Sequence, residues 1–368
     1  MSKVRAHAYL QDVEPYLPGD FAVEGVTEVI KLSSNESLLG ASPAVDAALS
    51  AMKGDTHTYP DSFSTEVREA IGRTYGLDPD RMVCESGSEP FINLLARAYA
   101  GPGYEILYSQ YGFIAYKLAA EAVGATPVSA PEAEHTTDVD ALLSSVTDKT
   151  RIVFLANPNN PTGTRIPFSE IRRLREGLSE SVLLVLDAAY AEFSQEDSYH
   201  DGSELVDDEP GNVVVLHTFS KIYGLAALRL GWAYCPAEVG NVLNQLRGVF
   251  TVSSAAQVAG VAALEDAAHT NSVVEHTSKW RSWLTEELSA LGLNVLPSYA
   301  NFVCVEFASA QAAEAADLAL RQRGLIPRTL KEYGLADCLR ITIGLEQHCR
   351  GVVEVLTPLR LRSSGGKR

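Results

Sequence analysis

Six short apolar runs are the feature that most constrains how this chain can fold. They are RMVCE (81–85), YEILYS (104–109), RIVFLA (151–156), SVLLVLD (181–187), NVVVLH (212–217) and GWAYC (231–235). Each run is apolar along most of its length and does not alternate with polar residues, which is typical of strands buried on both faces of a mostly parallel sheet. Amphipathic segments of helical length, such as 90–100 and 168–179, lie between several of the runs. This alternation predicts an α/β fold in which helices cover both faces of the sheet.

Size, charge and composition limit what such a chain can bind. A chain of 368 residues is long enough for two domains that share an interface. Its formal net charge of -17 argues against nucleic acid as a partner. No apolar run approaches the roughly 20 residues that span a bilayer, and the N-terminus has no apolar signal segment, so we expect a cytoplasmic protein with no membrane contact. The five cysteines are scattered without a C-x-x-C pair, which indicates reduced thiols and no metal site.

Polar segments stand at the carboxyl ends of five of the predicted strands. They are SGSEP (86–90), SQYGF (109–113), NPNNPTG (157–163), DAAY (187–190) and TFSK (218–221). Ligands of open α/β sheets bind beyond the carboxyl ends of the strands. We therefore expect these segments to meet around one ligand, and their side chains suit a phosphorylated aromatic cofactor.

Lys221 is the most informative residue of these segments. It follows an apolar strand and has small and apolar neighbours, although Lys221 at the start of a solvated helix is the alternative. A lysine in a partly desolvated pocket has a lowered pKa, so its neutral amine can form a Schiff base with an aldehyde. The sequence thus favours Lys221 as a carbonyl-trapping amine.

The other candidates divide among the parts of such a cofactor. Asp187 ends an apolar strand and could pair with a protonated pyridine nitrogen, or could cap the next helix. Asn160 and Tyr190 could hydrogen-bond a phenolic oxygen, and Tyr111 could stack on the ring, although turn-forming or core roles are the alternatives. A phosphate could be held by the helix start at Gly87 and Ser88, by the hydroxyls of Thr218 and Ser220, and by Arg229.

Taken together, these motifs resemble the fold type I pyridoxal phosphate aminotransferases, and within them the histidinol-phosphate aminotransferase-like group. The resemblance runs from EPYLPG and KLSSNES through TYPD, NPNNPTG, DAAY and SKIYGLAALRLGW to CLRITIG. It implies pyridoxal 5'-phosphate as the cofactor, Lys221 as the aldimine lysine and Asp187 at the pyridine nitrogen. It also implies a backbone contact from Glu89 to the phosphate and a homodimer in which Tyr59 reaches the neighbouring site. The residues that it places beside the substrate are Arg340, Arg328, Tyr16 and Asn35.

The resemblance also predicts the division of the chain. We expect an N-terminal arm (1–35), a large cofactor-binding domain (36–245), a small C-terminal α/β domain (246–362) and a flexible tail (363–368). In the small domain, 300–307 and 338–344 are expected as strands, and 309–323 and 346–358 as helices.

Three segments depart from the pattern of the group and leave the substrate open. The group's NENPLG is NESLLG here, Glu89-Pro90 replaces an acidic pair, and Thr251 stands where an asparagine is expected. We expect an aminotransferase that moves an amino group from histidinol phosphate, an aromatic amino acid or a specialised biosynthetic donor to a 2-oxo acid such as 2-oxoglutarate. The alternative is a decarboxylase of the threonine-phosphate type, which shares the motifs around the ring.

Overall fold

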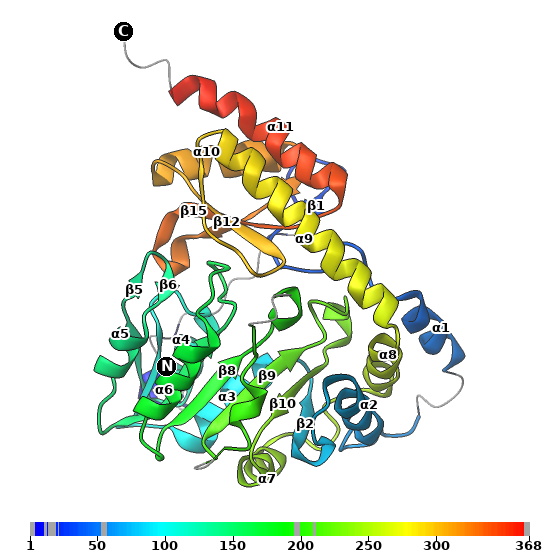
Figure 1. The fold of residues 1–368 in the computed structure, drawn as a ribbon, viewed down its shortest axis with the longest axis vertical. Coiled ribbons are helices and arrows are strands. Elements are labelled where there is room, and N and C mark those ends of the chain that lie inside the picture. Colours follow the sequence, from blue (N-terminus) through cyan, green and yellow to red (C-terminus); the bar gives the residue numbers. More distant parts are fainter. Residues whose placement is uncertain are drawn as a thin grey trace.

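The structure is a computed structural model that describes residues 4–10, 13, 20, 22–52, 57–194, 199–208 and 211–363. Tyr16 and the predicted tail beyond residue 363 lie outside the described residues. Figure 1 shows two regions, a larger one built on a seven-stranded sheet and a smaller one at the other end, which contains α10 and α11. Within the described part of the chain, no helix combines the length and apolar character needed to cross a membrane.

The larger region is organised around the predicted mostly parallel sheet. In spatial order its strands are β2 (Met82–Glu85), β10 (Gly231–Tyr234), β9 (Val213–Thr218), β8 (Leu183–Asp187), β7 (Thr150–Ala156), β3 (Glu105–Ser109) and β4 (Thr126–Ala130). Only β10 runs antiparallel to its neighbours. All six apolar runs form strands, which confirms the predicted architecture.

Both faces of this sheet are buried, as the continuous apolar runs require. On β8, Leu184 and Leu186 belong to one apolar cluster, whereas Leu183 and Val185 belong to another on the opposite face. The first cluster includes side chains from α2 (Thr65–Tyr75), α5 (Val139–Ser144), α6 (Phe168–Gly177) and α8 (Ser254–Glu265). The second includes side chains from α3 (Glu89–Tyr99), α4 (Ile114–Ala122) and α7 (Ala237–Leu246).

The smaller region contains a four-stranded antiparallel sheet. Its strands, in spatial order, are β11 (Asn294–Val295), β12 (Phe302–Glu306), β15 (Leu335–Thr342) and β14 (Arg328–Leu330). A third apolar cluster joins this sheet to α9 (Ala267–Ala290), α10 (Ala310–Gln322) and α11 (Glu346–Ser363). The N-terminal segment contributes β1 (Ile30–Lys31), which pairs with β13 (Leu325–Ile326) of the C-terminal part.

Short elements complete the chain. A helix, α1 (Pro43–Ala51), packs on α8, and a two-stranded ribbon pairs β5 (Glu132–Ala133) with β6 (Thr136–Thr137). The 3-10 helices are η1 (Ala8–Leu10), η2 (Pro79–Arg81), η3 (Ala191–Phe193), η4 (Ser203–Leu205), η5 (Ala226–Leu228) and η6 (Lys331–Tyr333).

Side-chain packing does not divide the chain at the expected residue 246. Helix α8 packs on α1 and α2, and its buried residues Ala256 and Ala259 belong to the core of the larger region. Val274, in the first part of α9, belongs to that core too, whereas Leu284 further along the same helix belongs to the core of the smaller region. The change from one core to the other therefore falls inside α9, which Figure 1 shows running from α8 to the smaller region.

Candidate active site

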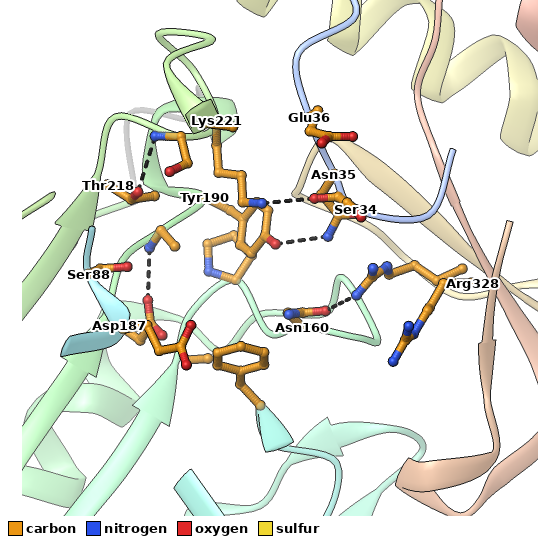
Figure 2. A pocket seen from close by; sticks show the side chains of 18 of the residues that line it. Ser34, Asn35, Glu36, Ser88, Asn160, Asp187, Tyr190, Thr218, Lys221 and Arg328 are labelled. Carbon is orange, nitrogen blue, oxygen red and sulfur yellow. Dashed lines mark hydrogen bonds between the residues drawn. The ribbon is translucent and has the colours of Figure 1, made fainter. Parts of the chain in front are cut away.

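A cavity of about 330 Å³ lies beyond the carboxyl ends of the central strands, between the two regions. Most of the predicted site residues line it, namely Asn35, Ser88, Glu89, Asn160, Asp187, Tyr190, Thr218, Ser220, Lys221, Arg229, Arg328 and Arg340. They come from segments that are far apart in the sequence. The strands of the large sheet bring most of them to one edge, whereas Arg328 and Arg340 come from the antiparallel sheet of the smaller region and Asn35 from the N-terminal segment. Figure 2 shows how these side chains lie around the cavity.

Lys221 follows β9 and extends into this cavity. Its Nζ donates a hydrogen bond to the backbone oxygen of Ser34 at 3.0 Å. Burial lowers the pKa of Lys221 to about 8, and the positive charges of Arg340 and Arg229 act in the same direction. A substantial fraction of this amine is therefore neutral near pH 8, as a nucleophilic lysine requires.

Asp187 ends β8 with its carboxylate buried at the cavity wall. Its Oδ2 accepts a hydrogen bond from the hydroxyl of Tyr116 at 2.8 Å, and its Oδ1 accepts one from the backbone N–H of Ala189 at 3.2 Å. Burial raises the pKa of Asp187, and the hydrogen bond from Tyr116 opposes that rise. The helical turn that follows is capped at Tyr190, so Asp187 does not have the helix-capping position that was the alternative.

Tyr190 and Asn160 lie on the side of the cavity nearer the smaller region. The hydroxyl of Tyr190 accepts a hydrogen bond from Nδ2 of Asn35 at 2.8 Å. The side-chain oxygen of Asn160 accepts a hydrogen bond from Arg340, whose guanidinium also donates to the backbone oxygen of Ser33. Residues of the smaller region thus hold groups of the larger region at the shared cavity.

A cluster of donors forms another corner of the cavity. Ser88 occupies the N-cap position of α3, and its side chain forms no capping hydrogen bond. Nη1 of Arg229 lies 3.3 Å from the hydroxyl of Ser220. Gly87 is adjacent, with a φ of 99°, and a Cβ atom there would lie 2.5 Å from Nη2 of Arg229. The positive φ favours glycine at this position, and a side chain there would also displace the guanidinium of Arg229.

Three of the predicted residues that the structure describes do not line the cavity: Gly87, which lies beside Arg229, Tyr111 and Tyr59. Tyr111 lies outside it: its backbone N–H donates to Glu132, and its ring stacks on His135 with the ring centroids 5.5 Å apart. Phe113, two residues later, lines the cavity instead. Tyr59 is 80% exposed and stacks on Phe250, and neither residue lines the cavity.

Sequence reasoning missed several groups at the site. Phe113 stands in the same segment as Tyr111, and its aromatic ring was a signal that could have identified it. Tyr116 gave no signal, because it occupies the apolar face of α4 and meets Asp187 across 71 positions of sequence. Other missed lining residues are Ser33, Ser34, Glu36 and Tyr333.

Comparison with known proteins agrees with this geometry. The family model of aminotransferase class I and II matches residues 27–356. The chain is 52% identical to histidinol-phosphate aminotransferase of Rhodospirillum rubrum over 349 residues, which cover 94% of each chain. It is 50% identical to the enzyme of the same name from Paramagnetospirillum magneticum, over 94% of this chain and 96% of that one.

A solved structure is similar over the same extent. Histidinol-phosphate aminotransferase from Sinorhizobium meliloti, crystallised in complex with pyridoxal-5'-phosphate, superposes with a TM-score of 0.85 at 28% identity and covers 92% of both chains. N-Succinyldiaminopimelate aminotransferase from Mycobacterium tuberculosis, at 20% identity and a TM-score of 0.80, shares the fold. This chain belongs to the aminotransferase class I and II family and is a pyridoxal phosphate-dependent transaminase with the type I fold.

Proposed function

We propose that this transaminase uses histidinol phosphate as its amino donor and a 2-oxo acid such as 2-oxoglutarate as its acceptor. The observation that carries the proposal is the identity of 50–52% to histidinol-phosphate aminotransferases over 94% of the chain. Two arginines, Arg328 and Arg340, are both buried at the cavity wall and line the same cavity as Lys221. Guanidinium groups suit a substrate phosphate or carboxylate, because they donate two parallel hydrogen bonds to such groups.

The residues around the cavity fit pyridoxal phosphate. The carboxylate of Asp187 suits a protonated pyridine nitrogen, and the polar side chains of Asn160 and Tyr190 suit the phenolic oxygen. The donor corner suits the phosphate: the hydroxyls of Ser88, Thr218 and Ser220, the N–H groups at the start of α3, and Arg229. The close approach of Gly87 to Arg229 keeps this corner free of a side chain that would fill it.

The bound cofactor supplies an electron sink that stabilises negative charge at the substrate Cα. Lys221 would hold the cofactor through its aldehyde. Its neutral amine, when released by substrate, would accept the proton from Cα, and the resulting ammonium would deliver that proton to the former aldehyde carbon as general acid. The lowered pKa of Lys221 suits both roles near neutral pH.

Asn35 acts on the site indirectly in this proposal. It is buried, its Nδ2 donates to Tyr190, and its Oδ1 accepts from the hydroxyl of Thr342 at 3.2 Å. Both polar atoms of its side chain are engaged in this way. We therefore assign Asn35 to holding the hydroxyl of Tyr190, and assign substrate binding to Arg340 and Arg328.

A homodimer with shared sites is also part of the proposal. Tyr59, Phe63 and Val249 expose 80%, 56% and 65% of their surface, and Tyr59 stacks on Phe250, which exposes 44%. Exposed apolar groups gathered in this way mark a surface for association. Tyr59 on this surface would reach the phosphate corner of the neighbouring subunit.

The domain division and the cellular location complete the proposal. We place the arm before β1, the larger cofactor-binding domain up to the first part of α9, and the smaller domain from the rest of α9 onward. All five cysteines are free and buried, which supports the reducing environment of the cytoplasm.

A half-reaction tests the donor. Histidinol phosphate, phenylalanine, glutamate and phosphothreonine are added singly to the holoenzyme without an oxo acid, while the visible absorption of the bound cofactor and the release of carbon dioxide are followed. Histidinol phosphate is expected to bleach the visible band fastest, without carbon dioxide. Faster bleaching by phenylalanine would move the donor to the aromatic class, and carbon dioxide from phosphothreonine would support the decarboxylase alternative, which no relative reported above favours.

A further inference from the structure

We infer that the hydroxyl of Tyr116 is a positioning group that orients the Asp187 carboxylate and keeps it ionised to pair with the cofactor's pyridine nitrogen. The inference rests on the proposed role of Asp187 and adds a residue that no sequence motif indicated. Tyr116 does not line the cavity, so it acts through Asp187.

The geometry fixes both oxygens of the carboxylate. Tyr116 lies in the first turn of α4, is fully buried, and donates to Oδ2 of Asp187 at 2.8 Å. The N–H of Ala189 donates to Oδ1 at 3.2 Å. An ionised carboxylate only accepts hydrogen bonds, so two donors on its two oxygens both orient it and favour the ionised form.

Contacts with neighbouring aromatic rings fix the orientation of the Tyr116 ring and therefore the position of its hydroxyl. It stacks on Phe154 with the ring centroids 4.7 Å apart and the planes within 1° of parallel. Phe113 packs against it edge-on at 5.9 Å, and Tyr108 packs at 6.3 Å. Because Phe113 lines the cavity, the same ring supports one cavity wall and directs the carboxylate beside it.

The Tyr116 hydroxyl is one of the groups that determine the protonation state of Asp187. Burial raises the pKa of Asp187, and the groups that oppose the rise are the Tyr116 hydroxyl, the N–H of Ala189 and the positive charges of His217 and Lys221. Burial also raises the pKa of Tyr116 well above its ordinary value, and so does the neighbouring carboxylate, so the hydroxyl keeps its proton and remains a donor. Without that donor, Asp187 shifts toward the neutral acid, which does not stabilise a protonated ring nitrogen.

The test compares two cofactors on three proteins. The cofactors are pyridoxal phosphate and its analogue with carbon in place of the ring nitrogen. The proteins are the full-length wild type, Tyr116→Phe, and Tyr108→Phe as the matched control. Tyr108 belongs to the same aromatic cluster but stands on β3, two strands away from β8, and does not line the cavity. The readouts are the dissociation constant of each cofactor from the apoprotein between pH 5.5 and 8.5, and the melting temperature.

Wild type and Tyr108→Phe are expected to bind pyridoxal phosphate more tightly than the carbon analogue. Tyr116→Phe is expected to lose about 10-fold to 100-fold of that preference, the range of a hydrogen bond to a charged group. The loss should be largest at the acidic end, where Asp187 is most easily protonated. The affinity for the carbon analogue should stay near that of wild type, because that analogue has no ring nitrogen to pair.

Three outcomes would overturn the inference. One is an unchanged preference in Tyr116→Phe, another is an equal loss of affinity for both cofactors, and the third is failure of Tyr116→Phe to fold while Tyr108→Phe folds. The last two would make the hydroxyl a structural group. A wild type that did not bind pyridoxal phosphate at all, or did not hold it at Lys221 after borohydride reduction, would instead contradict the proposed function.

Discussion

Two buried charged clusters lie on opposite faces of the same pair of strands, β8 and β9, and only one of them opens to the cavity. Asp187 is paired in register with Leu216, so His217 on the same strand points to the other face. On that face Nε2 of His217 lies 2.9 Å from Asp201, and its Nδ1 lies 3.5 Å from Glu192. The imidazole stacks on Trp232 with the ring centroids 4.2 Å apart.

We call His217, Asp201 and Glu192 the closed cluster, because it does not open to the cavity, and its cation is paired within the cluster. Burial alone would lower the pKa of His217, but its contacts with Asp201 and Glu192 raise the pKa to about 9. The pKa of Asp201 falls to about 2, because the hydrogen bond and charge of His217 outweigh the effect of burial. The cation of this cluster is thus paired with carboxylates of the protein itself, and we assign the cluster to stability.

We call Lys221 and Asp187 the open cluster, because both residues line the cavity, and other groups determine their charges. Burial, together with neighbouring positive charges, lowers the pKa of the Lys221 amine, and the Asp187 carboxylate is held by donors that leave it facing the cavity. A charged site that is not balanced by its own residues is suited to a ligand that carries complementary charges. Buried charge alone therefore does not identify a functional site, whereas buried charge with an incomplete charge balance at a cavity does.

The largest expected effect separates the two clusters by activity. Lys221→Ala should reduce the rate of transamination of histidinol phosphate by about 10⁴-fold or more, because it removes both the amine and the general base. The unfolding free energy should stay unchanged or rise, since a partly desolvated cation is removed. Steady-state rates and chemical denaturation measure the two effects.

The exposed Lys117→Ala on α4 is the matched control, because it removes a lysine that is far from the cavity. Cofactor that remained covalently fixed to Lys221→Ala after borohydride reduction would disprove the assignment.

The next effect falls on stability and not on the site. His217→Gln should lower the unfolding free energy by about 3 kcal/mol, because it leaves two largely buried carboxylates, Asp201 and Glu192, without their cation. His200→Gln is the control, since His200 is half exposed beside Glu204 and should change stability by no more than about 0.5 kcal/mol. Urea denaturation of the apoproteins measures both, and equal stability of the two variants would break the comparison.

Alkaline pH should weaken the closed cluster. Because the folded-state pKa of His217 is raised to about 9, its contribution is fully present below its unfolded pKa of about 6.5. That contribution declines as pH rises from about 6.5 and is lost once pH has passed the folded-state value, for a total of about 3 kcal/mol. Denaturation between pH 6 and 10 should show this decline in wild type and a flatter profile in His217→Gln. Parallel profiles for the two proteins would contradict it.

The smallest effect concerns the open cluster and runs in the opposite direction with pH. With the Lys221 pKa at about 8, the rate of covalent attachment of pyridoxal phosphate to the apoprotein should rise about 10-fold from pH 7 to 9 and then level off. Stopped-flow absorbance follows the attachment. In Arg340→Ala the midpoint should move to higher pH, because one of the positive charges that lower this pKa is gone. A rate that kept rising beyond pH 10 would indicate an ordinary lysine.

The fold was largely predictable because its strands are buried on both faces. Continuous apolar runs identified six of the seven strands of the large sheet. The seventh, β4, lies at the edge with partly exposed side chains, and its sequence TPVSA is not an apolar run. The domain boundary at residue 246 stays a prediction, and side-chain packing favours a boundary inside α9, because the Ala-rich α8 belongs to the core of the larger region.

Site residues that directly follow a buried strand could be predicted from the sequence, whereas site residues elsewhere were harder to predict. Lys221, Asp187 and Tyr190 follow buried strands, so their gathering at one edge follows from the parallel sheet. The stacking role of Tyr111 stays a prediction, because the sequence does not show which side of this turn faces the cavity. In the structure the ring of Tyr111 contacts His135, whereas Phe113 lines the cavity. Tyr116 could not be found, because a tyrosine on the apolar face of a helix looks like any core residue until its hydroxyl is located.

Helix α9 contributes to both apolar cores, and this limits where domains can be exchanged between relatives. A fragment that began at residue 246 would carry α8 away from its partners and leave its apolar face, including Ala256 and Ala259, in water. A chimera joined beyond Val274 would keep α8 and the first part of α9 with the core of the larger region, but it would have to conserve Ala300 and Phe302, which belong to that core too. Helix α9 is one continuous helix of 24 residues, about 36 Å long. A chimera joined within it must therefore keep the number of residues in the helix. Otherwise Trp280 and Leu284 would rotate away from the sheet that they cover.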